Sequence, residues 1–283
     1  MGGRRPSPRR NRLRRAEAVQ TWHKHGFCVP QTDGSSVITA RGGSCEENAD
    51  MPLVVVDDIE MYYESRGSGP ALVVIGGLGL EMSELDTLLN RLASSFRVVA
   101  FDNRGAGRSS KPRGPYSIEQ MAGDAAGLMD RLDLPRAHVL GISMGGRIAM
   151  ALALAHPERV DHLVLVSTGP RAAGARWLVR LGMLVSDLPL VRGRHRQPRY
   201  ALKAQFDATR AFDCTERLEE IEQPTLILHG RSDHIAPVAL AEQMHAQIPN
   251  SRLVLFEGGH LFTFTTQREK FVVDVDAFLT PSR

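Results

Sequence analysis

The feature that most constrains this chain is a serine between two glycines, placed where an apolar strand gives way to a helix. Ser143 is the centre of the G-x-S-x-G pattern of residues 141–145. Residues 137–140 are predicted to form a short buried strand, and residues 146–155 are apolar and rich in helix formers. Residues 160–167 are again strand-like. This order of strand, turn, helix and strand predicts a βαβ unit and therefore a parallel sheet.

The two glycines give the serine a chemical interpretation. Gly141 and Gly145 leave room for a strained turn that exposes the Ser143 hydroxyl. The same turn directs the first N–H groups of the following helix towards that oxygen. Ser143 is therefore a candidate nucleophile, with Gly141 and Gly145 as the glycines of its turn.

The alternation of strands and helices extends over most of the chain. Eight strands are predicted, of which the first two form an antiparallel hairpin at one edge: residues 53–56, 60–63, 71–75, 96–101, 137–140, 160–167, 224–229 and 252–256. Helices are predicted between them and after them at residues 81–92, 117–132, 146–155, 238–247 and 271–279. We expect one α/β domain over residues 51–283, with a mostly parallel eight-stranded sheet flanked by helices.

A nucleophilic serine requires a base, and the base requires a group that orients it. Asp233 follows the strand 224–229, and His260 follows the next strand after two glycines. Active sites of open α/β sheets lie beyond the carboxyl ends of the strands, so Ser143, Asp233 and His260 should converge there. Asp213 is a rival acid, but it precedes the strand 224–229.

Five motifs in this order resemble the α/β-hydrolase family and, within it, small esterases and enol-lactonases. They are Gly76-Gly77-Leu78-Gly79, residues 102–109, the Ser143 turn, Gly230-Arg231-Ser232-Asp233 and Gly258-Gly259-His260. The resemblance covers about residues 53–279 and implies an α/β-hydrolase fold. One departure is Gly76-Gly77, where many family members have His-Gly.

The resemblance also implies roles and a reaction. Ser143 would attack an acyl carbonyl, His260 would serve as base and then acid, and Asp233 would orient the imidazole. The main-chain N–H groups of Met144 and Leu78 would bind the oxyanion. The expected reaction is hydrolysis of a small carboxylic ester or lactone, with no metal or cofactor.

Two alternatives remain open. In the first, the same residues and fold serve a carbon–carbon bond hydrolase, a thioesterase or a cofactor-free perhydrolase. In the second, the protein is a ligand-binding relative that has lost catalysis. Dehalogenases and epoxide hydrolases of this fold use an aspartate nucleophile, so the serine at position 143 argues against both classes.

Asp102 is interpreted as a turn and helix-capping residue, and His229 and His234 as supporting loop residues.

An insertion at residues 168–222 is longer than a crossover requires, and by resemblance it forms a small helical lid. Trp177 and Leu181 begin an apolar helical face, continued by Leu184 and Leu188, that would either line an acyl pocket or pack on the domain. Residues 168–212 contain eight arginines and one lysine against two acids. This basic lid would either attract an anionic substrate or form a solvated surface.

Residues 1–50 differ in composition from the rest. Seven arginines and no acid occur in residues 1–15, and glycine and serine clusters follow. We interpret this stretch as a disordered extension or as the result of a start codon set too early, rather than as a nucleic-acid or membrane anchor. No apolar run is long enough for a membrane span, and three scattered cysteines fit a cytoplasmic protein. The oligomeric state is not predicted.

Overall fold

The computed structural model describes residues 52–173, 195, 197–264 and 267–280. Its eight strands are β1 (Leu53–Val56), β2 (Ile59–Arg66), β3 (Ala71–Ile75), β4 (Arg97–Phe101), β5 (Ala137–Ile142), β6 (Val160–Val166), β7 (Thr225–Gly230) and β8 (Ser251–Phe256). The described α-helices are α1 (Asp86–Leu92), α2 (Ile118–Arg131), α3 (Met144–Ala155), α5 (Arg199–Ala211), α6 (Val238–Gln247) and α7 (Arg268–Leu279).

The strands form one sheet in the order β1-β2-β4-β3-β5-β6-β7-β8. β1 and β2 pair antiparallel, as do β2 and β4, and every other pairing is parallel. This confirms the predicted eight-stranded, mostly parallel sheet with its antiparallel edge. The carboxyl ends of β3 to β8 therefore meet at one edge of the sheet, where the candidate residues lie.

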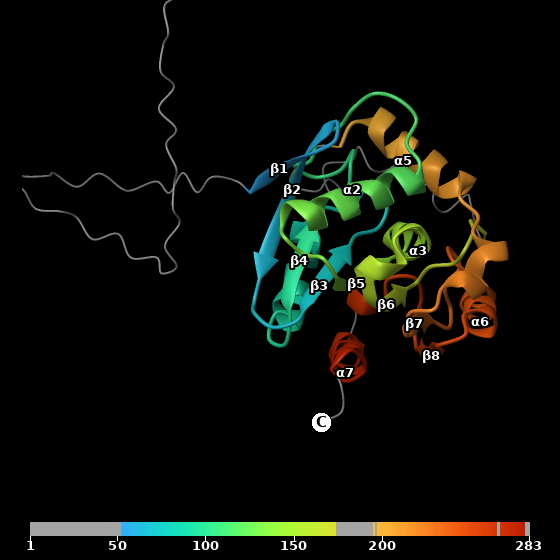
Figure 1. Ribbon diagram of the computed structural model, residues 1–283. Helices are drawn as coiled ribbons and strands as arrows, with labels where there is room; N and C mark the ends of the chain where they lie inside the picture. The colour runs from blue at the N-terminus through green and yellow to red at the C-terminus, as the bar shows by residue number, and fades with distance from the viewer. Residues whose placement is uncertain (1–51, 174–194, 196, 265–266, 281–283) are drawn as a thin grey trace, which may run out of the picture. The chain divides into compact units, whose positions relative to one another are not determined.

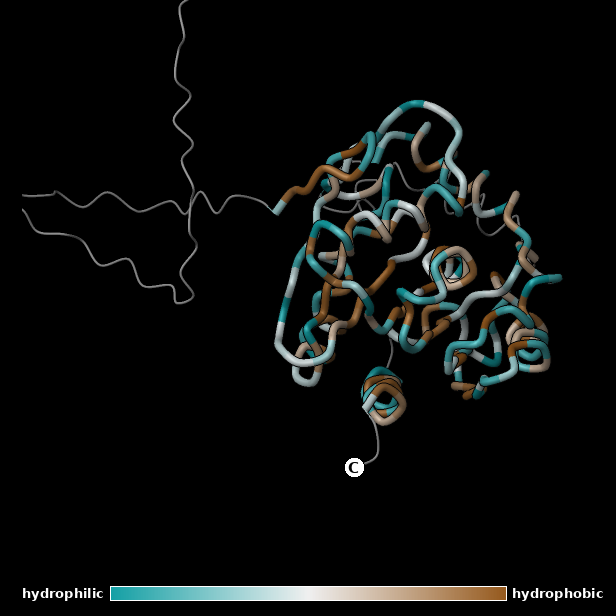
Figure 2. Tube along the Cα trace, viewed as in Figure 1, coloured by the Kyte–Doolittle hydropathy of each residue, from teal (hydrophilic) through white to brown (hydrophobic). Residues whose placement is uncertain are grey.

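Helices cover both faces of the sheet. α2, α3 and α6 pack on one face around Val73, Val139 and Ile227, while α1 and α7 pack on the other around Val74, Leu140 and Leu228 (Figure 1). Successive residues of a strand thus enter opposite cores, as alternation of side chains requires. Hydrophobic stretches accordingly follow the strands between the two helix layers (Figure 2).

Some boundaries differ from the prediction, and tertiary contacts explain why. α3 begins at Met144 rather than after two more residues, so Gly145 and Gly146 are helical despite the low helix propensity of glycine. A Cβ at Gly145 would lie 2.1 Å from the Ile75 main-chain oxygen, and one at Gly146 would lie 2.5 Å from the Thr168 side chain. The predicted helix 81–92 is divided into a 3₁₀ turn (Met82–Leu85) and α1.

The insertion at 168–222 is described only in part. α5 lies within it, in a segment that was expected to be helical but for which no helix bounds were predicted. Trp177, Leu181 and most of the clustered arginines lie outside the described residues. Among the helices that are described, none is long and apolar enough to cross a bilayer.

Candidate active site

Ser143 lies in the turn between β5 and α3, and its backbone conformation is strained. Its φ is +56° and its ψ is −114°, a strained combination for a residue with a side chain. The Ser143 N–H donates to the Val166 carbonyl at 2.8 Å, and the Thr168 hydroxyl donates to the Ser143 carbonyl at 2.7 Å. Contacts with β6 and the residues after it therefore hold the turn in place.

The flanking glycines are required by close approach. A Cβ at Gly141 would lie 2.3 Å from the Gly145 main-chain oxygen, well inside any real contact. Gly77 also faces the turn, since a Cβ there would lie 3.4 Å from the Ser143 Cβ. The loop after β3 thus lies directly against Ser143.

Three of the predicted residues form a continuous chain of hydrogen bonds. His260 Nε2 is 2.9 Å from Ser143 Oγ, and His260 Nδ1 is 2.7 Å from Asp233 Oδ2. An ionised Asp233 accepts from Nδ1–H, which leaves Nε2 to accept from the serine hydroxyl. The second oxygen of Asp233 accepts from the N–H groups of Ile235 and Ala236, each at 2.9 Å. The carboxylate is buried, so its orientation is fixed.

The loops that carry Asp233 and His260 are bonded to each other. Ser232 N–H donates to the Gly258 carbonyl at 2.9 Å, and a Cβ at Gly230 would lie 2.4 Å from the Gly259 oxygen. Gly230 therefore permits the two loops to touch. His229 lies behind Asp233, with Nε2 at 2.7 Å from the Ala236 carbonyl, and burial lowers the pKa of its imidazole. It supports the loop, as interpreted from the sequence.

Two residues whose main-chain N–H groups are candidate oxyanion donors lie at the cavity. Met144 and Leu78 both line the cavity that contains Ser143 and His260. Among the described residues, none accepts a hydrogen bond from the N–H of Met144 or of Leu78. Neither N–H group is thus taken up by a described acceptor, as the oxyanion role implied by the resemblance requires.

The loop that carries Leu78 has supports that the sequence did not reveal. Asn103 Nδ2 donates to the Gly76 carbonyl at 3.0 Å, and Gly79 N–H donates to Gln205 Oε1 at 3.0 Å. Gln205, fully buried on α5, also donates to the Arg104 carbonyl at 2.7 Å. Its only sequence signal is a glutamine among apolar neighbours in a helix.

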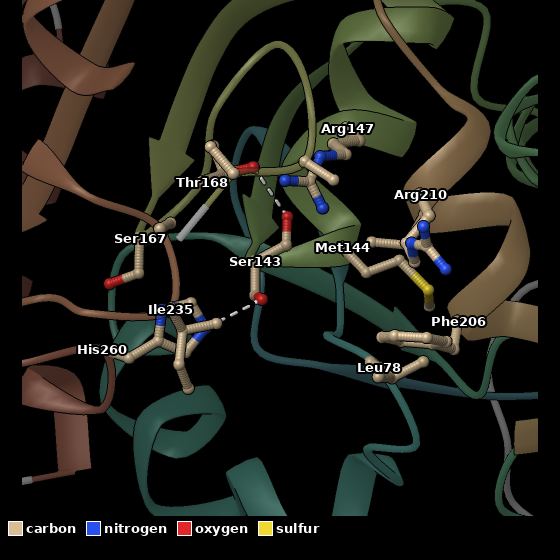
Figure 3. Close-up of a pocket in the computed structure, with 14 residues that line it drawn as sticks. Leu78, Ser143, Met144, Arg147, Ser167, Thr168, Phe206, Arg210, Ile235 and His260 are labelled. Carbon is tan, nitrogen blue, oxygen red and sulfur yellow. Dashed lines mark hydrogen bonds between the residues drawn. The ribbon is translucent and has the colours of Figure 1, made fainter. Parts of the chain in front are cut away.

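The cavity at Ser143 is lined from several elements (Figure 3). The lining residues are Leu78, Ser143, Met144, Arg147, Ser167, Thr168, Ala172, Ala173, Phe206, Thr209, Arg210, Ile235, Ala236 and His260. The insertion after β6 contributes Ala172 and Ala173, and α5 contributes Phe206, Thr209 and Arg210. The predicted lining residues Trp177 and Leu181 lie outside the described residues.

The remaining polar candidates have structural partners. Asp102 accepts from the N–H of Met82 at 2.7 Å and from that of Arg108 at 2.8 Å, so it caps the 3₁₀ turn and closes its own loop. Asp213 is exposed and accepts from the Thr215 N–H at 2.9 Å, whereas the carboxylate bonded to His260 is that of Asp233.

In the described part of the chain, one group could offer three metal ligands. It consists of His138, Asp161 and His162, whose ligand atoms lie within 4.8 Å of one another. The group lies at the amino ends of β5 and β6, opposite Ser143, and Asp161 already pairs with Arg136 at 3.0 Å. It takes no part in the site described above.

Known proteins are similar to this chain in sequence and in fold. The family model of the alpha/beta hydrolase fold matches residues 70–216. The putative carbamate hydrolase RutD of Azorhizobium caulinodans is 32% identical over 248 residues, which cover 76% of this chain and 94% of that protein.

Two solved structures are similar. A hydrolase from Pseudomonas aeruginosa has a TM-score of 0.74 and 28% identity, covering 83% of this chain and 100% of that one. The enol-lactonase from Burkholderia xenovorans has a TM-score of 0.71 and 27% identity, covering 81% and 100%. The chain therefore belongs to the α/β-hydrolase fold family, and it is a hydrolase.

Proposed function

We propose that the protein hydrolyses small carboxylic esters or lactones through an acyl-enzyme at Ser143. The observation that carries the proposal is the pair of hydrogen bonds that joins Asp233 to His260 at 2.7 Å and His260 to Ser143 at 2.9 Å. These distances fit direct proton transfer between the serine hydroxyl and the imidazole.

Acylation follows from these positions. His260 Nε2 takes the hydroxyl proton as Ser143 Oγ bonds to the acyl carbon, and the carbonyl oxygen becomes an oxyanion beside the N–H groups of Met144 and Leu78. The imidazolium then gives its proton to the leaving alcohol as the acyl–oxygen bond breaks. Asp233 stabilises the imidazolium throughout.

Deacylation repeats the cycle with water. His260 takes a proton from the water as its oxygen bonds to the acyl carbon, and it returns that proton to Ser143 Oγ as the free acid leaves. In a lactone the leaving alcohol remains attached to the acyl group, so the product is a single hydroxy acid.

We further propose that residues 168–222 act as a lid on the α/β domain of residues 51–283.

A panel of substrates tests the reaction class. We expect p-nitrophenyl esters and simple lactones to be turned over, and Ser143→Ala to abolish turnover of both. Thioesters, carbamates and carbon–carbon cleavage substrates belong in the same panel, since carbamate hydrolysis is named for one relative. A higher kcat/KM for any of these classes than for esters and lactones would contradict the proposal. No turnover of any class would favour a non-catalytic ligand-binding protein.

A further inference from the structure

Two arginines line the cavity of Ser143 and His260 without a carboxylate partner among the described residues. Arg147 lies on α3 one turn beyond Ser143 and is only 7% exposed. Arg210 lies near the end of α5, with its guanidinium 5.7 Å from the centre of the Phe206 ring. The described lining of the cavity contains no aspartate or glutamate. Its positive charge is therefore uncompensated.

The burial of Arg147 is unusual for an unpaired cation. Its Nε donates to the Gly169 carbonyl at 3.2 Å, and its Nη2 donates to the Arg171 carbonyl at 2.9 Å. Burial lowers the pKa of the guanidinium to about 10, which leaves it charged at neutral pH. A buried charge is costly unless a counter-charge compensates it, and carbonyl dipoles do so only in part. An anion in the cavity would complete its environment.

A hydroxyl group adds to the polar character of the cavity. Thr209 Oγ1 is buried, Thr209 lines the cavity, and this oxygen has no hydrogen-bond partner among the described residues. Buried hydroxyls are normally satisfied, so this one suggests a polar group that joins it on binding. Thr209 is next to Arg210 on α5.

The position of these groups identifies which part of a substrate they would meet. Figure 3 shows His260 on one side of Ser143, with Phe206 and Arg210 on the other and Arg147 above the serine. The leaving group must face His260, because His260 protonates it. The acyl portion therefore extends towards Phe206 and the two arginines.

We infer that Arg147, Arg210 and Thr209 bind a carboxylate carried on the acyl portion, so that the substrates are monoesters of dicarboxylic acids or carboxylate-bearing lactones. This inference rests on the proposed function and names its substrate class. Guanidinium groups suit a planar carboxylate because they donate two parallel hydrogen bonds.

Two esters with one leaving group and equal chain length test the inference. We expect kcat/KM for mono-p-nitrophenyl glutarate to exceed that for p-nitrophenyl pentanoate. Arg147→Met should lower this ratio by about tenfold to a hundredfold, the range for a lost hydrogen bond to a charged group. Arg210 is exposed, so Arg210→Met should lower it by about twofold to fivefold, the range for a solvent-screened ion pair. Thr209→Val should lower it less. A wild-type ratio at or below one, or a ratio unchanged in both arginine variants, would overturn the inference.

Lys203→Met is the matched control. Lys203 is exposed on α5 and pairs with Asp207, so the variant removes one charge from the same helix without altering the cavity. The glutarate-to-pentanoate ratio of Lys203→Met should equal that of the wild type. A fall as large as that in the arginine variants would indicate a general electrostatic field instead of a binding subsite. Arg147→Lys keeps the charge and should lower the ratio less than Arg147→Met. This difference between the two variants separates an effect on substrate binding from an effect on folding.

Calorimetric titration of Ser143→Ala with monomethyl glutarate separates this inference from the proposed function. Binding that is lost on adding Arg147→Met supports the subsite, even if the wild type hydrolyses no ester. Hydrolysis of neutral esters without any binding of the glutarate would refute the subsite alone.

Discussion

Replacing Gln205 by Leu tests whether α5 supports the loop that carries Leu78, a proposed oxyanion donor. The side chain accepts from the N–H of Gly79 and donates to the carbonyl of Arg104, so it links α5 to the loops after β3 and β4. Leucine is similar in size but offers neither bond. We expect the loop that carries Leu78 to lose its fixed position and the protein to lose stability.

The magnitude follows from the groups left without partners. An unsatisfied buried main-chain group costs about 1–3 kcal/mol, so losing the partners of Gly79 and Arg104 should reduce the free energy of unfolding by about 2–6 kcal/mol. Complete loss of one oxyanion donor costs about a hundredfold or more in kcat. Because Leu78 N–H would be displaced only part of the time, kcat for p-nitrophenyl acetate should fall at least tenfold, with KM less affected.

Urea unfolding and steady-state kinetics on folded protein measure the two effects separately. Gln223→Leu is the matched control, because Gln223 is buried and donates to the Pro157 carbonyl at 3.1 Å, remote from Ser143. It should lower stability without changing kcat. A Gln205→Leu enzyme that is destabilised but retains full kcat would refute the supporting role.

Three further results are expected. Asp233→Asn should lower kcat by about 10⁴-fold, through the wrong imidazole tautomer; a small change would direct attention to Asp213. Gly145→Ala should prevent folding or abolish activity, measured by circular dichroism and turnover, because its Cβ would lie 2.1 Å from the Ile75 oxygen; near-normal values for both would contradict the geometry. Burial lowers the pKa of His138 below its ordinary value of 6.5, so the unfolded chain binds the proton more readily and stability should fall as pH drops below about 6.5. His138→Asn should make thermal unfolding less dependent on pH between 5 and 7, and an unchanged slope would refute this.

The sequence was most informative where function follows directly from a strand end. Ser143, Asp233 and His260 each come within a few residues of a strand in a parallel sheet, so their convergence could be predicted from order alone. The G-x-S-x-G pattern also carries its own steric reason in the contact between Gly141 and Gly145. These are local properties, visible in a few adjacent residues.

The contributions of α5 and α3 could not be predicted, because they depend on contacts between distant segments. Gln205 meets Gly79 across 126 positions of the chain, and nothing adjacent to either residue indicates the pairing. Arg147 is the single arginine of an apolar helix. Only the structure shows that it is buried at the cavity and that no described carboxylate pairs with it. A cluster of lid arginines was visible in the sequence, but the buried arginine outside that cluster was not singled out.

Covalent labelling with a fluorophosphonate, followed by peptide mapping, identifies the nucleophile of the protein. We expect one adduct per chain, on Ser143, formed far more slowly after His260→Ala and absent after Ser143→Ala. Labelling of another residue in the wild type, or normal labelling of Ser143→Ala, would contradict this expectation.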